Sequence, residues 1–497
     1  MCIDFTTRES PAVKETPEFI GSTLSGFAAL DPHETAIHYK NERISRAKLA
    51  HATQARANFI KTRAAHRPKA VLDFRDPLEL LIWFLAVSLA GGEAQVVDPD
   101  WPDPIKQKMI SLLQPSLVLP RDLETDAFHM PDRQGARFRE DDIAFGPSGP
   151  DESFYVGFTS GSTELPKGYR RSHSSWIKSF EAEGEEFAIT SDDVISAIGS
   201  LSHSLFLYAA LRAVQVGARL ILSPRFDPHH AVQGMRSAHA TIVYAAPSHL
   251  KLLERVKGPP VTSVRLLLSS GSKWLEPSDS LSALFPCAEM SEFYGTSELS
   301  FVSVRRAADQ APKGSVGRPF PHVHLTIRDR EGLRLPSGEV GRIYVESPFL
   351  FQDYVSDEQS LHRCGAEFSV GDLGWLDERG FLFLEGRENR MLVTSGKNVY
   401  PEQLEHSLMA HAGIEQAAVL GVEDDKRGSR LVACIMPRAG CSVSARDLIV
   451  HLKSSTSASL IPLTYLLPHQ WRWTRSGKTD FAALADDVKR LAYEIIP

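Results

Sequence analysis

Short apolar runs alternate with segments of helical periodicity along most of this chain, and that alternation restricts the fold more than any other feature. The runs at Ala218–Phe226 (ARLILSPRF) and Val264–Gly271 (VRLLLSSG) are rich in Leu, Ile and Val and stop at Ser, Pro or Gly. Interior strands of a covered sheet have this pattern. The apolar run Leu80–Ala90 is well short of the roughly 20 residues that span a bilayer, so we expect a core helix there. The whole pattern favours a layered α/β architecture over a β-sandwich or a helical bundle.

The sequence pattern changes after Ser337. Segment Asp372–Arg387 (DLGWLDERGFLFLEGR) has a Glu-Arg-Gly turn between two aromatic-rich runs, which predicts a β-hairpin within a strand-rich subdomain. After Asn389 we expect a helix, two strands, a helix, a strand and a helix, a small α+β unit of about 100 residues. We therefore predict a large N-terminal domain of layered α/β subdomains plus a β-rich subdomain (residues 1–387), and a small mobile C-terminal α+β domain (residues 388–497).

Composition restricts the class of protein and its partners. The chain has 497 residues, of which 42% are apolar and 24% charged, as in folded globular proteins. Its 62 acidic and 55 basic residues give a formal charge of -7, so no global positive field favours nucleic acid. The N-terminus, MCIDFTTRES, lacks a basic segment followed by an apolar stretch. We expect a cytoplasmic protein that is not integral to a membrane and has no nucleic-acid partner; its oligomeric state stays open.

The segment Phe158–Gly168 (FTSGSTELPKG) carries the strongest chemical signal. Four hydroxyl side chains and two glycines surround Lys167 within these residues. Unhindered backbone N–H groups, hydroxyl donors and a cation together suit a polyphosphate. A Walker P-loop fits poorly, because its lysine follows a glycine whereas Lys167 follows Pro166. From composition alone, an ordinary Ser/Thr turn is the alternative.

The same loop resembles the phosphate-binding signature of the adenylate-forming superfamily, which includes acyl-CoA synthetases, adenylation domains of peptide synthetases and firefly-type luciferases. The family pattern is T-S-G-[TS]-T-G-x-P-K-G, and Glu164 stands where the family has glycine. Further segments resemble family motifs in the family's order, so the resemblance covers most of the chain: Ala90–Pro102, Ser291–Glu298 (SEFYGTSE), Phe368–Arg390, Thr394–Glu405 and Trp473–Phe481 (WTRSGKTDF).

The resemblance implies a nucleotide site. Its residues would be Thr159, Ser160, Gly161, Ser162, Thr163, Lys167, Gly271, Ser272, Tyr294, Gly295, Ser297, Asp372 and Arg387. In the family's terms, Tyr294 lies against adenine and Ser297 at the α-phosphate, while Asp372 accepts hydrogen bonds from the ribose hydroxyls with Arg387 as a second contact. Glu298 would be the Mg²⁺ ligand, and Asn389 falls at the interdomain hinge. Val370 replaces a family threonine.

The resemblance also implies an acid pocket and a thiol tunnel. His203, in LSHSLF, looks like the histidine at the carboxylate end of the pocket in fatty and aryl acyl-CoA synthetases. The segment lacks the aspartate with which adenylation domains bind an α-amino group, so a simple carboxylic acid is favoured. A core histidine is the alternative for His203. Further pocket candidates are Tyr244, Ala246 and Ser270, and the thiol-tunnel candidates are Gly396 and Lys397.

These roles imply an acid–thiol ligase that forms AMP. ATP with Mg²⁺ would activate a simple carboxylic acid to an acyl-adenylate, releasing pyrophosphate, and a thiol, most simply that of CoA, would then take the acyl group. The catalytic candidates are Lys167, Lys478, Glu298 and His203. Two alternatives stay open. One is a stand-alone adenylating enzyme that loads the phosphopantetheine of a separate carrier protein, and the other is a non-catalytic nucleotide-binding relative, suggested by Glu164, Val370 and Asn389.

Overall fold

A computed structural model describes most of the chain. The described residues are 17–64, 66–121, 146–147, 149–159, 166–271, 278–355, 362–394, 397–424, 428–453, 460–474 and 479–497. The chain divides into a larger compact unit, Met1–His324 with Glu346–Gln359, and a smaller one, Leu325–Val345 with Ser360–Pro497. The predicted domain boundary between residues 387 and 388 stays a prediction.

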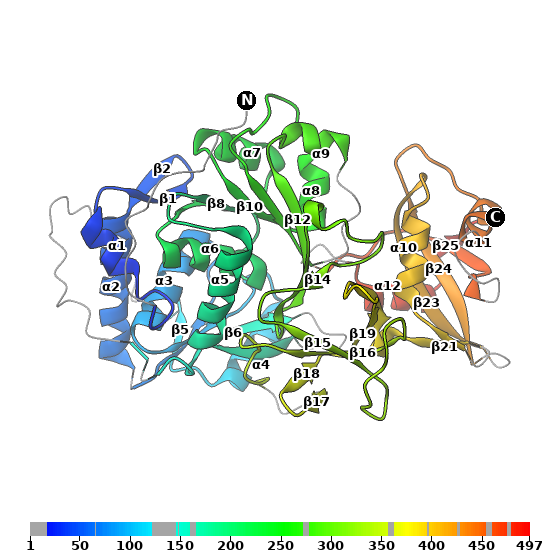
Figure 1. Cartoon of the computed structure of the whole chain (residues 1–497), viewed down its shortest axis with the longest axis horizontal. Coiled ribbons are helices and arrows are strands. Elements are labelled where there is room, and N and C mark those ends of the chain that lie inside the picture. The colour runs from blue at the N-terminus through cyan, green and yellow to red at the C-terminus, as the bar shows by residue number, and fades with distance from the viewer. Residues whose placement is uncertain are drawn as a thin grey trace. The chain divides into compact units, whose positions relative to one another are not determined.

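The larger unit contains an extensive mixed sheet, which we call the first sheet (Figure 1). Its strands, in spatial order, are β14 (Arg318–Pro319), β13 (Ser300–Arg305), β12 (Glu289–Thr296), β11 (Leu266–Ser269), β10 (Ile242–Ala245), β8 (Val194–Ala197), β9 (Arg219–Leu222), β1 (Thr35–Tyr39) and β2 (Glu42–Ser45). Strands from β12 to β1 are parallel to their neighbours, and the edges are antiparallel. The strands expected in residues 218–226 and 264–271 are confirmed as β9 and β11. All residues of β8, β10 and β11 are buried, as expected for a covered sheet.

Helices cover the first sheet. Helix α6 (Ser204–Val216) packs on β8, β9 and β10. The helices that follow β9, β10 and β11 are α7 (Pro228–Ser237), α8 (Pro247–Leu253) and α9 (Asp279–Leu284), and α5 (His173–Phe187) precedes β8. This alternation of strand and helix is the layered α/β arrangement that the sequence predicts.

A second sheet in the larger unit carries the hairpin of the predicted phosphate loop. Its strands, in spatial order, are β5 (Leu117–Leu119), β3 (Lys69–Leu72), β4 (Glu93–Val96), β6 (Ser153–Thr159) and β7 (Lys167–Ser172). Helices α3 (Pro77–Leu89) and α4 (Asp103–Leu113) pack on this sheet, whereas α2 (Arg46–Arg63) packs on α3 and on β1 and β2 of the first sheet, with α1 (Leu24–Leu30) against α2. Helix α3 confirms the expected core helix. Asp76 caps it by accepting from the backbone N–H groups of Leu78 and Glu79.

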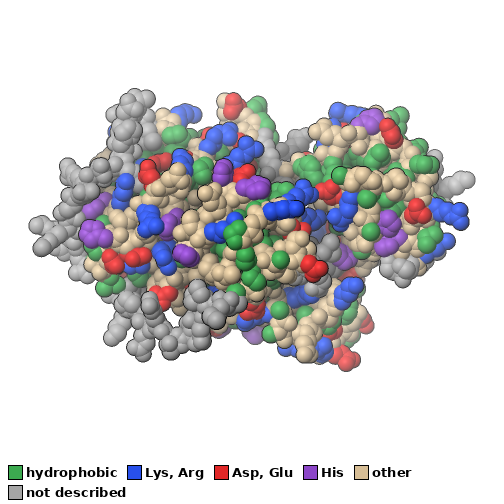
Figure 2. Space-filling view, turned by 90° about the horizontal axis from the view of Figure 1, so that it is seen from above, with side chains coloured by type: hydrophobic (Ala, Val, Ile, Leu, Met, Phe, Trp, Pro, Cys, Tyr) green, Lys and Arg blue, Asp and Glu red, His purple; other side chains and the backbone are tan. Residues whose placement is uncertain are grey.

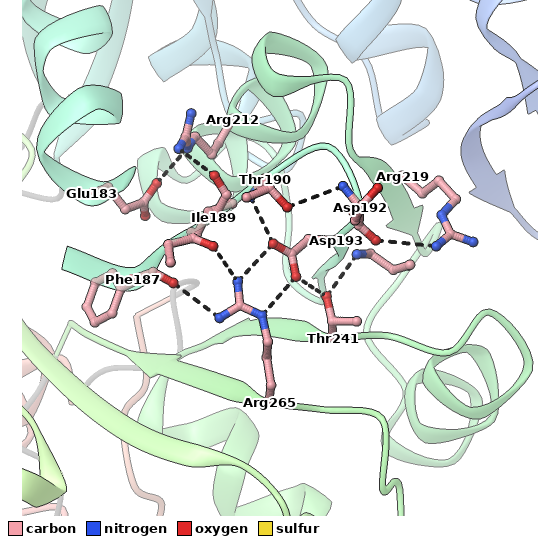
Figure 3. A network of polar contacts seen from close by, with 12 residues as sticks. Glu183, Phe187, Ile189, Thr190, Asp192, Asp193, Arg212, Arg219, Thr241 and Arg265 are labelled. Atoms are coloured by element: carbon pink, nitrogen blue, oxygen red, sulfur yellow. Dashed lines mark hydrogen bonds and ion pairs between the residues drawn. The ribbon is translucent and has the colours of Figure 1, made fainter. Parts of the chain in front are cut away.

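A polar network fixes the amino-terminal edge of the first sheet (Figure 3). The carboxylate of Asp193, directly before β8, accepts from the Thr241 hydroxyl at 2.7 Å and from Nη2 of Arg265 at 2.8 Å. Thr241 and Arg265 stand directly before β10 and β11. The network therefore joins three neighbouring strands at one edge. The opposite, carboxyl-terminal edge is where open α/β sheets bind ligands.

The smaller unit contains a β-rich sheet and a separate α+β fold. The β-rich sheet has the strands β17 (His362–Cys364), β18 (Glu367–Ser369), β16 (Gly341–Glu346), β19 (Asp372–Leu376) and β20 (Leu382–Arg387), and β15 (His324–Arg328) pairs with β16. The hairpin predicted at 372–387 is confirmed as β19 and β20. The sheet begins earlier than Ser337, where we expected it to start, because β15 buries only Ile327 and gives a weak apolar signal.

The C-terminal part contains the six predicted elements in the predicted order, together with three further strands. It contains β21 (Leu392–Thr394), β22 (Lys397–Val399), α10 (Pro401–Met409), β23 (Ile414–Asp424), β24 (Gly428–Pro437), α11 (Ala445–Lys453), β25 (Thr464–Pro468), α12 (Phe481–Lys489) and β26 (Tyr493–Ile495). Strands β23, β24, β25 and β26 form one sheet, and its apolar residues form a core cluster with those of α10 and α11. Strands β21, β22 and β26 were not expected, since each has three residues and too little sequence for a period to be read.

The surface in view carries charges of both signs. Figure 2 shows Lys and Arg side chains interspersed with Asp and Glu on this face. Within the described residues, every helix is too short or too polar to cross a lipid bilayer. The mixed charge agrees with the near balance of acidic and basic residues in the sequence.

Candidate active site

The β6–β7 hairpin places two predicted nucleotide residues opposite each other. Thr159 ends β6 and Lys167 begins β7, and the two are cross-strand partners in the antiparallel register. The loop between them, with the candidates Ser160, Gly161, Ser162 and Thr163, lies outside the described residues. The hairpin thus presents a hydroxyl and an ammonium group at the same end of the second sheet.

Several predicted pocket residues gather at the carboxyl-terminal edge of the first sheet. Ala246 directly follows β10, and Ser270 and Gly271 directly follow β11. Because β10 and β11 are parallel neighbours, their ends meet, and the backbone N–H of Ser270 donates to the Ala245 carbonyl at 3.4 Å. Gly271 has a φ of +103°, a conformation that favours glycine. Candidate Ser272 lies outside the described residues.

A second histidine, His249, connects His203 to the carboxyl-terminal edge of the first sheet, and the sequence analysis missed it. His203 is the N-cap residue of α6, and it interacts electrostatically with His249 in the first turn of α8. Nδ1 of His249 accepts the backbone N–H of Ala246 at 3.3 Å, so the proton of the neutral ring is on Nε2. Burial, with a smaller contribution from His203, lowers the pKa of His249 to about 4. His249 is therefore neutral at physiological pH.

Aromatic rings surround His249. The ring centroid of Phe226 lies 4.4 Å from that of His249, and the centroid of Phe206 lies 5.3 Å away. The structure thus brings His203 and Ala246 together beside an apolar wall. A histidine three residues after Ala246, at the start of a helix, was the available sequence signal.

Tyr244 has a different environment. Its side chain is fully buried within β10, and its hydroxyl donates to the carboxylate of Glu183. Arg212 pairs with the same carboxylate at 3.1 Å. Burial raises the pKa of Glu183 to about 7. These contacts place Tyr244 in the core, and its role in the pocket wall stays a prediction.

The end of β12 carries the predicted adenine residue, and the turn from β12 to β13 carries the predicted phosphate and metal residues. Gly295 lies at a register shift next to Tyr294, and a Cβ there would lie 2.1 Å from the carbonyl oxygen of Ser300. Only glycine fits this position. Oγ of Ser297 lies 3.2 Å from Oγ of Ser204, the residue after His203. The predicted α-phosphate contact therefore lies beside the predicted carboxylate end of the pocket.

Glu298, the predicted metal ligand, is buried and held in place. Its Oε1 accepts from the hydroxyl of Tyr354 at 2.9 Å, and its carbonyl accepts from the backbone N–H of Phe351 at 2.8 Å. Mg²⁺ in nucleotide sites is bound by one or two carboxylates together with phosphate oxygens and water. A single oriented carboxylate fits that pattern. Within the described residues, His, Cys, Asp and Glu form no group of three that could hold a metal by themselves.

The smaller unit holds the predicted ribose and hinge residues. Asp372 and Arg387 are cross-strand partners in β19 and β20, with Nε of Arg387 3.0 Å from Oδ1 of Asp372. Asn389 is exposed in a 3₁₀ turn (Glu388–Arg390). The next residue, Arg390, pairs with Glu405 of α10 at 2.6 Å. Asn389 thus stands between one arginine held by the β-rich sheet and another held by the C-terminal α+β fold.

Three further predictions fall outside the side chains that the structure describes. Gly396 and Lys478 lie outside the described residues, and Lys397 is described only through its backbone in β22. Their predicted roles in the thiol tunnel and in adenylation stay predictions.

The chain matches two family models, and the matched residues include most of the described site. The AMP-binding enzyme model matches residues 25–355, and the AMP-binding enzyme C-terminal domain model matches residues 403–478. The chain belongs to the AMP-binding enzyme family. Both matched ranges include predicted site residues: the first contains Lys167, His203 and Glu298, and the second contains Lys478.

Relatives and solved structures of AMP-binding enzymes agree with this assignment. The uncharacterized acyl–CoA ligase YhfT of Bacillus subtilis is 33% identical over 92% of this chain and 96% of its own length. The putative long chain fatty acid–CoA ligase VraA of Staphylococcus aureus is 28% identical over 90% of this chain and 93% of its own. ATP-bound MatB from Rhodopseudomonas palustris has a TM-score of 0.82 at 25% identity, covering 94% of this chain and 99% of that one.

These findings confirm the family, the fold class and the enzyme class that the sequence predicts. The family model, the AMP-binding enzyme, agrees with the adenylate-forming resemblance, and the relatives are named as acyl–CoA ligases. The chain is an AMP-forming ligase with a large α/β domain and a small C-terminal domain.

Proposed function

We propose that this AMP-binding enzyme activates a carboxylic acid at the α-phosphorus of ATP, releases pyrophosphate, and transfers the acyl group to the thiol of CoA. One observation carries the proposal. The contact between Ser297 and Ser204 brings the predicted α-phosphate residue next to His203, the predicted carboxylate-end residue. A carboxylate that attacks the α-phosphorus requires such proximity.

Positioning and charge neutralisation would do most of the catalysis. The carboxylate of the acid is itself the nucleophile, so no general base is needed, and phosphoryl-type transfer asks the protein mainly for orientation and electrostatic stabilisation. Lys167 would bind phosphate oxygens from the start of β7. Lys478 is the proposed second cation, at the α-phosphate and substrate carboxylate. Tyr294 and Ser297 would hold the adenine and the α-phosphate.

Glu298 would hold the Mg²⁺ that accompanies ATP. When bound, that ion neutralises phosphate charge. The buried carboxylate and its hydrogen bond from Tyr354 fix the direction in which the metal ligand points. Asp372 and Arg387 would bind the ribose hydroxyls.

Thiol transfer would follow a rotation of the C-terminal domain at Asn389. Gly396 and Lys397 would then line the path of the CoA thiol. The acceptor is proposed from the names of the relatives, since both YhfT and VraA are named as CoA ligases.

The proposed substrate is a simple carboxylic acid. The neutral imidazole of His249 and the rings of Phe206 and Phe226 make the end of the pocket near His203 mainly apolar. The name of VraA, a putative long chain fatty acid–CoA ligase, supports fatty acids as candidates and a place in fatty acid metabolism. A cytoplasmic location is part of the proposal.

Acid-dependent release of pyrophosphate tests the function. Short, long and aromatic acids would each be assayed with Mg·ATP, with and without CoA, and with a phosphopantetheine-bearing carrier protein. We expect release that increases with CoA and produces acyl-CoA. Pyrophosphate release that is independent of CoA and accompanied by acylation of the carrier protein would show the carrier-loading alternative. Binding of Mg·ATP without pyrophosphate release for any acid would show the non-catalytic alternative.

A further inference from the structure

Arg171 is a fully buried cation beneath the candidate phosphate site. It lies on β7, four residues after Lys167, with 2% of its surface exposed. Its guanidinium donates from Nη1 to the carbonyl of Ser297 at 2.9 Å, from Nη2 to the carbonyl of Phe349 at 2.8 Å, and from Nε to the hydroxyl of Ser175 at 3.2 Å. All three acceptors are uncharged. Arg171 thus holds the turn that carries Ser297 and Glu298.

Other buried arginines of the larger unit have carboxylate partners. Arg212 pairs with Glu183 at 3.1 Å and Arg56 pairs with Glu79 at 2.8 Å. Glu298 is a carboxylate whose field acts on Arg171, and among the described residues no ion pair joins the two. A buried charge without a close counter-ion costs several kcal/mol, whereas an apolar side chain of similar volume would fill the space without that cost.

The guanidinium is nevertheless charged at physiological pH. Burial lowers the pKa of Arg171 to about 10, which leaves the group protonated below pH 9. The nearby hydroxyls of Tyr155 and Tyr169 do not supply a negative charge, because burial raises the pKa of both. The positive charge of Arg171 is therefore only partly balanced by the protein.

Arg171 and Lys167 lie on the same face of strand β7. Alternate residues of a β-strand share a face, so Lys167, Tyr169 and Arg171 lie on one face of β7. Tyr169 forms a β-bridge with Tyr354, whose hydroxyl donates to Glu298, and Arg171 binds the carbonyl of Ser297. This face of β7 therefore supports the segment that carries the predicted α-phosphate and metal residues.

We propose that Arg171 is a positioning residue that fixes the Ser297–Glu298 turn and supplies a buried positive charge that a bound polyphosphate balances. The role rests on the proposed function, which places the phosphates of ATP at this turn. It predicts that Arg171 favours the triphosphate over the nucleoside, because a buried charge acts on a ligand in proportion to the ligand's charge.

Binding of Mg·ATP and of adenosine to the full chain tests this role. In Arg171→Met we expect affinity for Mg·ATP to fall about tenfold or more, and affinity for adenosine to stay within about twofold. KM for ATP should increase and KM for the acid should not. Arg171→Lys, which keeps the charge, should recover part of the Mg·ATP affinity. Arg56→Met is the matched control, a buried arginine on α2 whose loss should lower stability and leave both affinities unchanged.

Several outcomes would overturn the role. They are unchanged Mg·ATP affinity in Arg171→Met, equal losses for Mg·ATP and adenosine, and no recovery in Arg171→Lys. If Arg171→Met does not fold, Arg171→Lys decides: selective retention of Mg·ATP binding supports the role, and equal loss of both ligands contradicts it. A wild-type chain that binds no Mg·ATP would contradict both this role and the proposed function, whereas a defect-free Arg171→Met contradicts this role alone.

Discussion

The hydroxyl of Tyr354 donates a hydrogen bond to Oε1 of Glu298 at 2.9 Å, across 56 residues of sequence. Tyr354 also forms a β-bridge with Tyr169 of β7. The contact therefore ties the predicted metal ligand to the strand that begins with Lys167. Orientation of a metal-binding carboxylate by such a partner affects metal affinity.

Tyr354→Phe should lower the affinity for Mg²⁺ without abolishing activity. A hydrogen bond to a charged group contributes about 1.5–3 kcal/mol, so the Mg²⁺ concentration for half-maximal pyrophosphate release should increase about tenfold or more. Glu298→Gln should reduce the rate further, by roughly 100-fold. Tyr344→Phe, whose hydroxyl contacts Arg342, is the control and should titrate as the wild type does. An unchanged Mg²⁺ titration in Tyr354→Phe contradicts the orienting role.

Gly295→Ala should destabilise the turn that carries Ser297 and Glu298. The added methyl group would lie 2.1 Å from the carbonyl oxygen of Ser300, so the backbone must move. We expect a loss of about 2–4 kcal/mol in unfolding free energy, measured by urea denaturation, together with loss of adenylation. Gly234→Ala in α7 is the control: its nearest atom is 3.7 Å away, and it should gain roughly 0.5–1 kcal/mol. Equal stability of the two variants contradicts this reasoning.

His173 should make stability dependent on pH in the acid range. Its ring is buried, its Nδ1 accepts the backbone N–H of Ile20 at 3.2 Å, and burial lowers its pKa to about 3. The unfolded chain binds the proton near pH 6.5, so this contribution is complete above pH 6.5 and is lost as pH falls towards 3. Between pH 7 and pH 5 the loss should be on the order of 2 kcal/mol.

His173→Asn removes that titration. Its unfolding free energy, measured by urea denaturation at both pH values, should decrease less than that of the wild type by about this amount. The other titrating groups are common to both chains and cancel in the difference. Parallel pH profiles would show that His173 is not the source.

Asn389→Pro should separate the two half-reactions. Asn389 stands between Arg387, paired with Asp372, and Arg390, paired with Glu405. Of the two residues between these anchors, Glu388 is itself paired with Arg342, so we assign the rotation to the backbone of Asn389. Proline fixes φ and restricts that rotation. Acid-dependent pyrophosphate release should stay within about threefold of wild type, while thioester formation from supplied acyl-adenylate falls about tenfold or more. Asn389→Ala should retain both activities, and equal losses in both half-reactions of the proline variant contradict the hinge.

Much of the fold could be predicted because local patterns determine it. The run Leu80–Ala90 is apolar on all sides and becomes the buried helix α3, and the Glu-Arg-Gly turn before Phe381 predicts the β19–β20 hairpin. The resemblance to family motifs predicted site roles for Ser297, Glu298 and His203. The structure then shows that Ser297 lies near His203, because Ser297 contacts Ser204, the residue after His203.

The supporting residues could not be predicted from sequence, because their partners are distant. Arg171 bonds the carbonyl of Ser297, 126 residues away, and Phe349, 178 residues away. No local pattern marks such contacts. The direction of the Tyr244 side chain was equally hidden, since a residue in a fully buried strand faces apolar surroundings on either side.

Identification of the nucleotide product tests the central claim most directly. The enzyme would be incubated with Mg·ATP, CoA and an accepted acid, and the products quantified by mass spectrometry. Attack on the α-phosphorus predicts AMP, pyrophosphate and acyl-CoA in equal amounts. Acid-dependent formation of ADP and phosphate would contradict it.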